Sequence, residues 1–297
     1  MNSVKILTPR WYDEFVSIFF RIASSGFLPA SWFRKNLPDP GSRNSIDDKL
    51  NLEMVCHCWN YSHLLAYQLS SFILHPPANT KLTVTVFYCP EDSSTQKLLD
   101  YFSTRENENI HWNWKSLPKN QLFRRSIGRN NAAKNTQADW IWFTDCDIIF
   151  GEGCLDGLAE QLKGLTNTLV YPRHESTTSM LDDDNPLLKK GAEPQVVDID
   201  TSEFTLHSRD KAKGAFQIVH GDVSRAIGYC DQIRIYQTPA SNWRKTYEDT
   251  VFRWLLGTRG DPVDIPNVFQ IRHVSKGRYK KDSRISAIRS RIRQLQE

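Results

Sequence analysis

The sequence predicts an α/β protein organised around one mostly parallel sheet with flanking helices. Apolar, strand-like segments recur about every 30 residues, and each is followed by a segment whose apolar residues have helical spacing. Strands that alternate with helices form βαβ units with right-handed crossovers. The 297 residues, with 14 Gly and 14 Pro, exclude collagen-like and low-complexity classes and are sufficient for one large domain.

The alternation of strands and helices begins after residue 50. The predicted strands are residues 51–59, 82–88, 109–115 and 140–143, and the predicted helices are residues 61–74, 93–102 and 124–134. Residues 82–88, LTVTVFY, are typical of a strand because β-branched residues are frequent in them. Residues 61–74 are typical of a helix because Leu65, Leu69 and Phe72 recur at its period.

Two segments precede the first predicted strand. Residues 15–33 are apolar, but Arg21, Gly26 and Pro29 interrupt them, so they are not a membrane span. We expect them to pack against the body of the protein, and the alternative is a helix that lies in a membrane interface. Residues 34–48 are rich in Pro, Gly, Ser and Asp and predict a linker.

Polar residues follow the predicted strands. In a parallel sheet, ligands bind at the carboxyl ends of the strands. Asn60 follows the first strand, Glu91 and Asp92 follow the second, and Asp145 follows the fourth. These side chains suit a nucleotide, and we therefore expect the binding site at this edge.

Two acids interrupt an apolar run at residues 140–150, WIWFTDCDIIF. In an extended chain, Asp145 and Asp147 would point to the same side and Cys146 away from it. Paired carboxylates at a strand end can hold a hard divalent cation, whose other ligands are phosphate and water. Because unpaired charge is costly to bury, the pattern predicts a metal site.

A basic segment, residues 124–134, precedes the two acids. Arg125, Arg129 and Lys134 could meet the charge of a diphosphate, and the alternative is a solvated basic helix face. The short distance in sequence to Asp145 favours the diphosphate.

In this order and spacing, the segments resemble glycosyltransferases of the GT-A fold, especially the inverting family 2. The resemblance extends from about residue 52 to residue 273 and includes the pattern Arg129-Asn130 ahead of the Asp-x-Asp element. It implies a nucleoside-diphosphate sugar as donor and Mn²⁺ or Mg²⁺ as cofactor. The implied donor-binding residues are Asn60, Glu91, Asp92, Arg125, Arg129, Asn130, Lys134, Asp145 and Lys276, and the implied metal ligands are Asp145, Asp147 and His273.

The second half of the chain extends the resemblance. Residues 214–231 look like the acceptor-side strand and helix of the family, and residues 247–257 are similar to its Glu-Asp element. The resemblance implies that Asp249 is the base that deprotonates the acceptor hydroxyl and that Glu248 positions a substrate. The alternative for these two acids is a pair favoured by the dipole at a helix N-terminus.

The resemblance therefore implies a hexosyltransferase that acts with inversion on a glycan, lipid-linked or peptide acceptor. One alternative is a nucleotidyltransferase of similar fold, although the sequence has no Gly-rich phosphate loop after its first strand. The other is a non-catalytic sugar- or nucleotide-binding relative, against which the presence of Asp145, Asp147 and Asp249 argues. The expected units are residues 1–50 as an extension and linker, 51–150 and 151–275 as the donor and acceptor halves of the GT-A domain, and 276–297 as a C-terminal helix.

Charge is unevenly distributed along the chain. The net charge is +4, but residues 271–297 carry nine basic and two acidic residues, so residues 1–270 sum to −3. Residues 283–296 form an amphipathic basic pattern that suits peripheral contact with anionic lipid, or packing on the protein itself or on a second copy. No nucleic-acid partner is expected, since Trp residues are not interleaved with the basic ones. Six scattered cysteines and no secretory signal favour a cytoplasmic protein.

Overall fold

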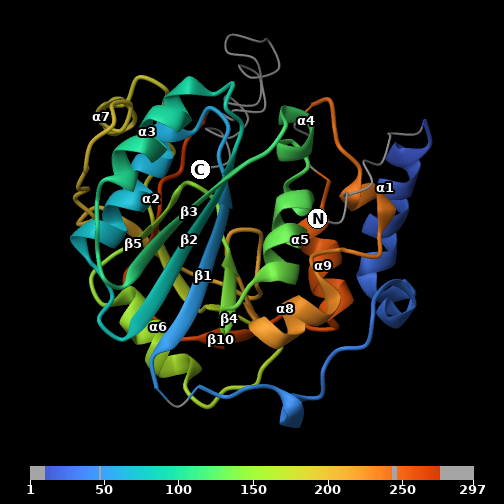
Figure 1. The fold of residues 1–297 in the computed structure, drawn as a ribbon. Coiled ribbons are helices and arrows are strands. Elements are labelled where there is room, and N and C mark those ends of the chain that lie inside the picture. The colour runs from blue at the N-terminus through green and yellow to red at the C-terminus, as the bar shows by residue number, and fades with distance from the viewer. Residues whose placement is uncertain (1–10, 47, 243–245, 275–297) are drawn as a thin grey trace.

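A computed structural model describes residues 11–46, 48–242 and 246–274, and it confirms the predicted α/β architecture (Figure 1). A seven-stranded sheet has the order β10-β6-β9-β4-β1-β2-β3, and a four-stranded sheet has the order β5-β11-β7-β8. Lys276 and the predicted helix within residues 276–297 lie outside the described residues.

The strands are β1 Leu50–His57, β2 Thr80–Tyr88, β3 Ile110–Ser116, β4 Trp140–Phe143, β5 Ile148–Phe150, β6 Leu169–Pro172, β7 His174–Thr177, β8 Thr205–Ser208, β9 Gln217–His220, β10 Asp261–Val263 and β11 Val268–Gln270. The α-helices are α1 Asp13–Ile22, α2 Ser62–Leu74, α3 Ser93–Ser103, α4 Lys119–Leu122, α5 Arg125–Asn135, α6 Cys154–Leu162, α7 Pro186–Lys190, α8 Gly221–Ile227 and α9 Glu248–Leu256. The shorter turns of helix are η1 Ala23–Phe27, η2 Ala30–Phe33, η3 Pro40–Ser42 and η4 Arg234–Gln237.

The first four strands are parallel neighbours, as the strand–helix alternation predicts. β1 pairs with β2 and with β4, and β2 pairs with β3, so their carboxyl ends meet at one edge of the sheet. Only β9 runs antiparallel to both of its neighbours, β4 and β6, within the seven-stranded sheet. Trp140, Trp142 and Phe143 of β4 are fully buried and form the centre of the core. All six cysteines are buried and free.

Helices cover the sheet on both faces (Figure 1). α2 and α3 pack against each other on one side, and α5 packs against β1 on the other. α8 packs in turn against α5, so the second half of the chain is attached to the nucleotide-binding half expected from the sequence.

The chain around the two acids differs from the sequence-based expectation. We expected Asp145 and Asp147 in an extended strand, but β4 ends at Phe143 and Cys146 and Asp147 lie in a turn. β5 then belongs to the four-stranded sheet, where it pairs antiparallel with β11. The argument from strand alternation was therefore wrong, because the acids lie where the chain passes from one sheet to the other.

The N-terminal segment packs against the body of the protein at α9, as expected for residues 15–33. Phe20 and Ala23 are buried, and Trp254 Nε1 of α9 donates a hydrogen bond to the Leu28 carbonyl at 3.1 Å. The predicted linker is also attached, since Arg43 is buried and donates to the Thr166 carbonyl at 2.6 Å. Among the described residues, none of the helices has the length and apolar character needed to cross a bilayer.

Candidate functional site

The connection between β4 and β5 carries the two acids of the Asp-x-Asp pattern. Gln68 Nε2 of α2 donates hydrogen bonds to the Asp145 carbonyl at 2.8 Å and to the Ile148 carbonyl at 3.0 Å. Cys146 is buried, and its thiol lies 3.3 Å from the His57 carbonyl of β1. These contacts fix the backbone of the turn from both sides and leave the Asp145 side chain 38% exposed.

Two arginines of α5 contact the first of these acids. Arg125 Nη1 donates to Asp145 Oδ1 at 2.8 Å, and Arg129 Nη2 lies 3.4 Å from the same oxygen. The two arginines are four residues apart and therefore share one face of the helix. The Arg129 side chain is fully buried, whereas 25% of the Arg125 side chain is exposed. The first turns of α5 thus place one buried and one accessible guanidinium beside Asp145.

Arg125 also reaches the second half of the chain. Its Nη2 donates to Glu248 Oε1 at 3.2 Å, and Glu248 is the buried first residue of α9. Burial acts to raise the pKa of Glu248, but Arg125 and the Thr246 hydroxyl outweigh it and set the pKa to about 2. Burial likewise acts to lower the pKa of Arg125, and Asp145 and Glu248 raise it above the ordinary value. Both members of this pair are therefore charged at neutral pH.

A second chain of hydrogen bonds connects the same two regions. Arg129 Nη1 donates to the Tyr229 hydroxyl at 2.9 Å, and that hydroxyl donates to Gln217 Oε1 at 3.0 Å. Gln217 Nε2 then donates to the Asp249 carbonyl at 3.0 Å. The turn at Asp145 and the start of α9 are therefore held together by two independent polar paths.

Asp249 is the more accessible acid of the Glu-Asp element. Its side chain is 28% exposed, against 6% for Glu248, and Arg253 Nη1 lies 3.8 Å from its Oδ2. A Cβ atom added to Gly214 would lie 3.7 Å from Asp249 Oδ2, so the glycine leaves room beside this oxygen. Of the two acids, Asp249 has the carboxylate that a second molecule can approach.

Asp147 and His273 come from segments that are hydrogen-bonded to each other. The Ile271 amide donates to the Asp147 carbonyl at 2.9 Å, and Gln270 Nε2 donates to Asp147 Oδ2 at 3.1 Å. His273 is 3% exposed and meets the Tyr61 ring edge-on at 5.4 Å between centroids. The carboxylate oxygens of two aspartates and an imidazole nitrogen are ligand types that suit Mn²⁺ or Mg²⁺. In the described part of the chain, however, no three His, Cys, Asp or Glu side chains are gathered into a group that could hold a metal.

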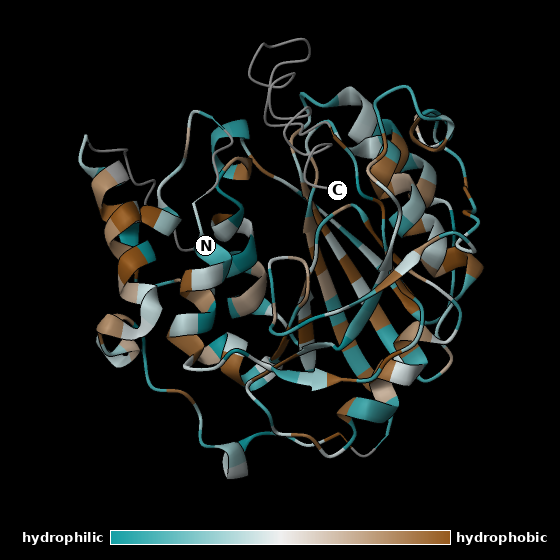
Figure 2. Cartoon of the chain, turned by 180° about the vertical axis from the view of Figure 1, so that it is seen from behind, coloured by the Kyte–Doolittle hydropathy of each residue, from teal (hydrophilic) through white to brown (hydrophobic). Residues whose placement is uncertain are grey.

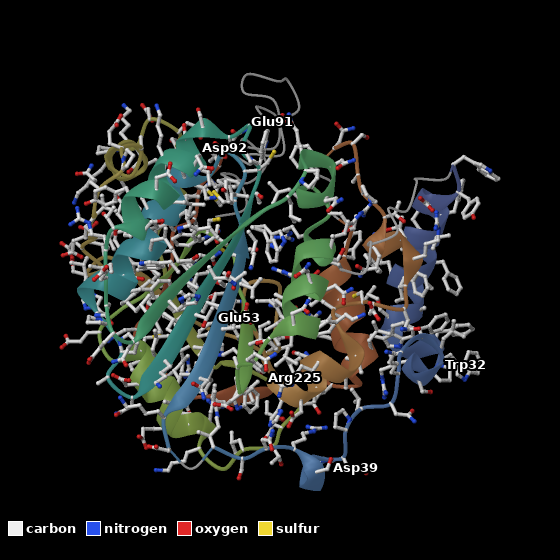
Figure 3. All side chains as sticks on the ribbon, in the orientation of Figure 1. Trp32, Asp39, Glu53, Glu91, Asp92 and Arg225 are labelled. Atoms are coloured by element: carbon white, nitrogen blue, oxygen red, sulfur yellow. The ribbon has the colours of Figure 1, made fainter. Side chains whose placement is uncertain are left out.

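The residues predicted to border the nucleotide base lie at the expected edge of the sheet. The Asn60 amide donates to Asp92 Oδ2 at 2.6 Å, and Asp92 also accepts from the Thr95 amide at 3.2 Å as the N-cap of α3. Figure 3 labels Glu91 and Asp92 close together at this edge. The Glu91 side chain is 63% exposed and pairs with Lys119 at 3.2 Å. Asp92 therefore joins the loops after β1 and β2, whereas Glu91 is open to solvent.

The structure does not bring two of the predicted donor-binding residues to this cluster. Asn130 Nδ2 donates to Asp231 Oδ1 at 2.9 Å, and Lys134 Nζ lies 3.3 Å from the same oxygen. Lys134 is nine residues beyond Arg125, or about 13 Å further along the helix axis. Both side chains attach α5 to the loop after α8.

The sequence analysis missed His57, which lies beneath the arginines. Its side chain is buried and stacked on Phe87 at 4.9 Å between ring centroids, and a Cβ at Gly128 would lie 2.1 Å from its Nε2. Burial, with Arg129 and Arg125 nearby, lowers the pKa of His57 well below its ordinary value, so the ring is neutral. The signal in the sequence was Gly128, an unfavourable residue within a helix that marks a close approach.

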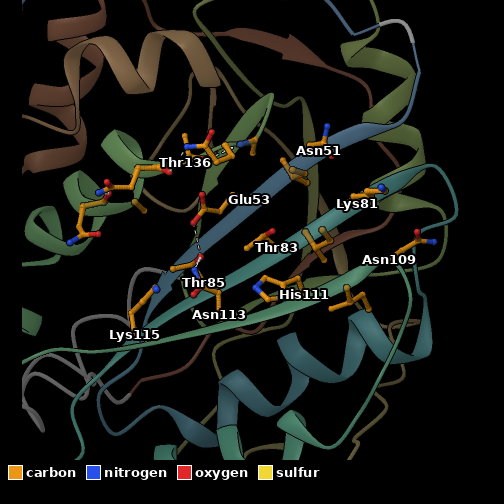
Figure 4. A pocket seen from close by; sticks show the side chains of 18 of the residues that line it. Asn51, Glu53, Lys81, Thr83, Thr85, Asn109, His111, Asn113, Lys115 and Thr136 are labelled. Atoms are coloured by element: carbon orange, nitrogen blue, oxygen red, sulfur yellow. Dashed lines mark hydrogen bonds between the residues drawn. The ribbon is translucent and has the colours of Figure 1, made fainter. Parts of the chain in front are cut away.

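A large polar pocket lies elsewhere, on the face of β1, β2 and β3 that α5 only partly covers (Figure 4). Its volume is about 900 Å³, and Asn, Gln and Thr side chains form much of its lining. Buried Glu53 accepts a hydrogen bond from the Thr85 hydroxyl at 2.6 Å within it. None of the residues predicted from the sequence to bind the donor, the metal or the acceptor lines this pocket.

Comparison with known proteins identifies one family. Residues 87–220, somewhat less than half of the chain, match the family model described as Glycosyl transferase family 2. The matched segment contains Arg125, Arg129, Asp145 and Asp147, and it ends at the last residue of β9. No curated protein matches the chain.

Three solved structures align with this chain, each with a TM-score of 0.46. Mannosyltransferase PcManGT from Pyrobaculum calidifontis in complex with GDP-Man and Mn²⁺ is 15% identical, and the alignment covers 96% of this chain and 76% of that one. S. aureus TarS 1-349 in complex with UDP-GlcNAc is 12% identical, with 81% and 66% covered. GalNAc-T7 with UDP, GalNAc and Mn²⁺ is 10% identical, with 92% and 55% covered.

The family match covers the chain from the end of β2 to the end of β9, and it supports glycosyl transfer as the activity. It includes the turn at Asp145 and the arginines that contact it, which are the residues that first indicated the resemblance. The chain is thus similar to glycosyltransferases of family 2 and has the α/β architecture expected of the GT-A type.

Proposed function

We propose that this protein transfers a sugar from a nucleoside-diphosphate sugar to an acceptor hydroxyl, with inversion and with Mn²⁺ or Mg²⁺. The observation that supports the proposal most is the position of Arg125 between Asp145 and Glu248, at 2.8 and 3.2 Å. This arrangement brings the acids expected at the donor next to the acids expected at the acceptor. The family match over residues 87–220 supports the same chemistry.

In this proposal, Asp249 is the general base and Glu248 is a positioning residue. A general base needs a carboxylate that the acceptor hydroxyl can reach and that can accept its proton. Glu248 is buried, and its pKa of about 2 in contact with Arg125 makes it a poor proton acceptor. The accessible Asp249 carboxylate, with the space left by Gly214 beside it, meets the requirement better.

Asp145, Asp147 and His273 would hold the divalent cation. When bound, the cation would neutralise charge on the diphosphate and stabilise it as the leaving group. Arg125 and Arg129 hold the Asp145 carboxylate in place, and Gln270 holds that of Asp147. Each of the two carboxylates is thus held by its own hydrogen bonds, and binding of the cation would have to bring both of them together with the buried His273 imidazole.

Accessibility separates the roles of the two arginines, and the other donor contacts are those that the family resemblance implies. Arg125 is partly exposed and would face the diphosphate, whereas buried Arg129 would act through Asp145. Asn60, Glu91 and Asp92 would border the base, and Lys276 would contact the diphosphate. The acceptor would be a glycan, a lipid-linked molecule or a peptide.

Release of nucleoside diphosphate from UDP-, GDP- and dTDP-sugars, with Mn²⁺ or Mg²⁺, tests the proposal. We expect turnover of one donor and a donor-dependent rise in the melting temperature, since a ligand that binds only the folded state stabilises it. Asp145→Asn and Asp147→Asn should lose metal-dependent turnover. Asp100→Asn is a matched control, because Asp100 lies on α3 and, within the described part of the chain, accepts a hydrogen bond from Gln96 alone, at 2.8 Å.

Three outcomes would contradict the proposal. If no nucleotide sugar is hydrolysed or shifts the melting temperature, the protein does not use such a donor. If the protein instead releases pyrophosphate from a nucleoside triphosphate and a sugar phosphate, it is a nucleotidyltransferase. Donor binding without turnover would indicate a non-catalytic relative.

A further inference from the structure

The N-terminal segment presents a large apolar face to solvent. Seven of its large hydrophobic side chains are exposed by 48% to 85% of their surface: Trp11, Phe15, Ile18, Phe19, Ile22, Phe27 and Trp32. Among the described residues, only Leu74 and Leu206 outside this segment are large hydrophobic residues with comparable exposure. A soluble monomer rarely exposes so many apolar side chains together, and such a patch marks an interaction surface.

The exposed side chains form one stripe because of their spacing. Trp11, Phe15, Ile18 and Ile22 follow one another at intervals of four, three and four residues, which is the period of one helix face. Phe20 and Ala23, on the other face, are buried against the body. Helix α1 is therefore apolar on both sides, and the described residues cover only one of them. Figure 2 shows the outer side of α1 as largely hydrophobic, and Figure 3 shows Trp32 at the edge of the molecule, pointing away from it.

The composition and charge of this face identify the kind of partner. Trp and Phe on an apolar face bordered by Lys or Arg are typical of helices that lie in the lipid interface. Residues 1–35 contain five basic residues against two acidic ones, Asp13 and Glu14, and of the described basic side chains Arg21 and Lys35 are exposed. Asp13 is buried. The basic border complements the negative surface of an anionic bilayer.

Two other occupants fit this face less well. In a two-fold dimer the same patch faces itself, so the basic residues of both copies would be brought together. Residues 1–10, MNSVKILTPR, contain only Met1, Val4, Ile6 and Leu7 as large apolar residues, too few to cover seven exposed ones, and they add two more basic residues. We propose that the apolar face formed by residues 11–32 docks the protein onto an anionic lipid bilayer.

Docking would hold the helix that carries Glu248 and Asp249 at the lipid surface. The Arg21 guanidinium lies 4.3 Å from the centre of the Tyr247 ring, directly before α9. Phe33 and Trp254 pack ring against ring, at 5.4 Å between centroids. The N-terminal segment that carries the apolar face is therefore packed directly against α9.

Flotation of the full-length protein with vesicles of phosphatidylcholine and phosphatidylserine, without any donor, tests the proposal. We expect the wild-type protein to float, and Phe15→Ser/Ile18→Ser/Ile22→Ser to bind at least about tenfold more weakly. Leu206→Ser is the control, because Leu206 is 65% exposed on β8, outside the face. All three changed residues are exposed, so circular dichroism and the melting temperature should report a folded variant.

Three results would overturn the proposal. The first is that the wild-type protein fails to float. The second is that the triple variant floats as well as the wild type, which would assign binding to another segment. The third is that the triple substitution converts a dimer of the wild type to a monomer and neither protein binds vesicles. Because no nucleotide sugar is present, none of these results depends on the proposed transferase activity.

Discussion

Arg125 and Glu248 form an ion pair, with Nη2 and Oε1 3.2 Å apart, that joins α5 to α9. Arg125 belongs to the segment that matches the glycosyltransferase family, and Glu248 lies beyond it. A single guanidinium therefore connects the Asp-x-Asp turn with the acids expected at the acceptor. The predictions below follow from this connection and from the buried groups around it.

Removal of Arg125 should destabilise the fold. Arg125→Met keeps much of the aliphatic stem but leaves the buried Glu248 carboxylate without its guanidinium, and we expect a loss of about 3 kcal/mol in the free energy of unfolding. Urea denaturation measures it. Arg173→Met is the control, because its pair with Asp264 is 45% and 61% exposed and should contribute less than about 1 kcal/mol.

A double-mutant cycle separates the ion pair from packing. In Arg125→Met/Glu248→Gln no charge is left unpaired, so the loss should be smaller than the sum of the two single losses. Strict additivity of the two single changes would show that the pair does not couple α5 to α9.

Glu248 should make stability depend on acid pH. Its pKa is about 2 in the folded protein against an ordinary value of 4.5, so the folded state binds fewer protons than the unfolded state in this range. The contribution of Glu248 to the free energy of unfolding is present above about pH 4.5 and is lost as the pH falls towards about 2. Glu248→Gln should flatten the fall in the free energy of unfolding over this window. An unchanged slope would mean that the carboxylate titrates normally.

Glu53 should have the opposite effect. Burial raises its pKa, although Thr136, Thr85 and Lys115 act to lower it, so the folded state retains the proton more strongly than the unfolded state. The contribution of Glu53 to the free energy of unfolding is full below its ordinary pKa. That contribution is lost as the pH rises through the pKa of Glu53 in the folded protein. Glu53→Gln should therefore raise the melting temperature at neutral pH and leave it nearly unchanged at acid pH. A lower melting temperature at both pH values would contradict this account.

Gly128 should tolerate no side chain while His57 is present. A Cβ at this position would lie 2.1 Å from His57 Nε2 and 3.0 Å from Phe87 Cδ2. We expect Gly128→Ala to cost about 1–3 kcal/mol in the free energy of unfolding. In a His57→Ala background the same change should cost less, because the colliding ring is absent. Thermal unfolding of the four proteins checks this, and an equal cost in both backgrounds would rule out the contact as the cause.

The sequence predicted the first four strands well, because their apolar runs are long and each is followed by a helix. It missed the four-stranded sheet, since β5 and β11 have three residues each and pair across more than a hundred residues of chain. Segments so short carry no periodicity, and nothing local specifies their partners. The same sheet explains why the turn at Asp145 was mistaken for a continuous strand.

The candidate site was predicted in part. Asp145, Arg125 and Arg129 lie together as predicted, but Lys134, predicted from the basic segment, and Asn130, predicted from the family resemblance, do not join them. Arg125 and Arg129 share one helix face, and Asn130 and Lys134 share another, rotated by about 140° from the first. That rotation could have been read from the sequence. The ion pair to Glu248 could not, because it depends on how α9 packs.

The most direct test of the account is donor hydrolysis by Asp249→Asn. Water replaces the acceptor in this assay, so the base is still required. We expect the rate constant to fall by at least about 100-fold while the donor-dependent rise in melting temperature stays the same. An unchanged rate would contradict the assignment of Asp249 as the base, and with it the account of the two joined halves as one catalytic site.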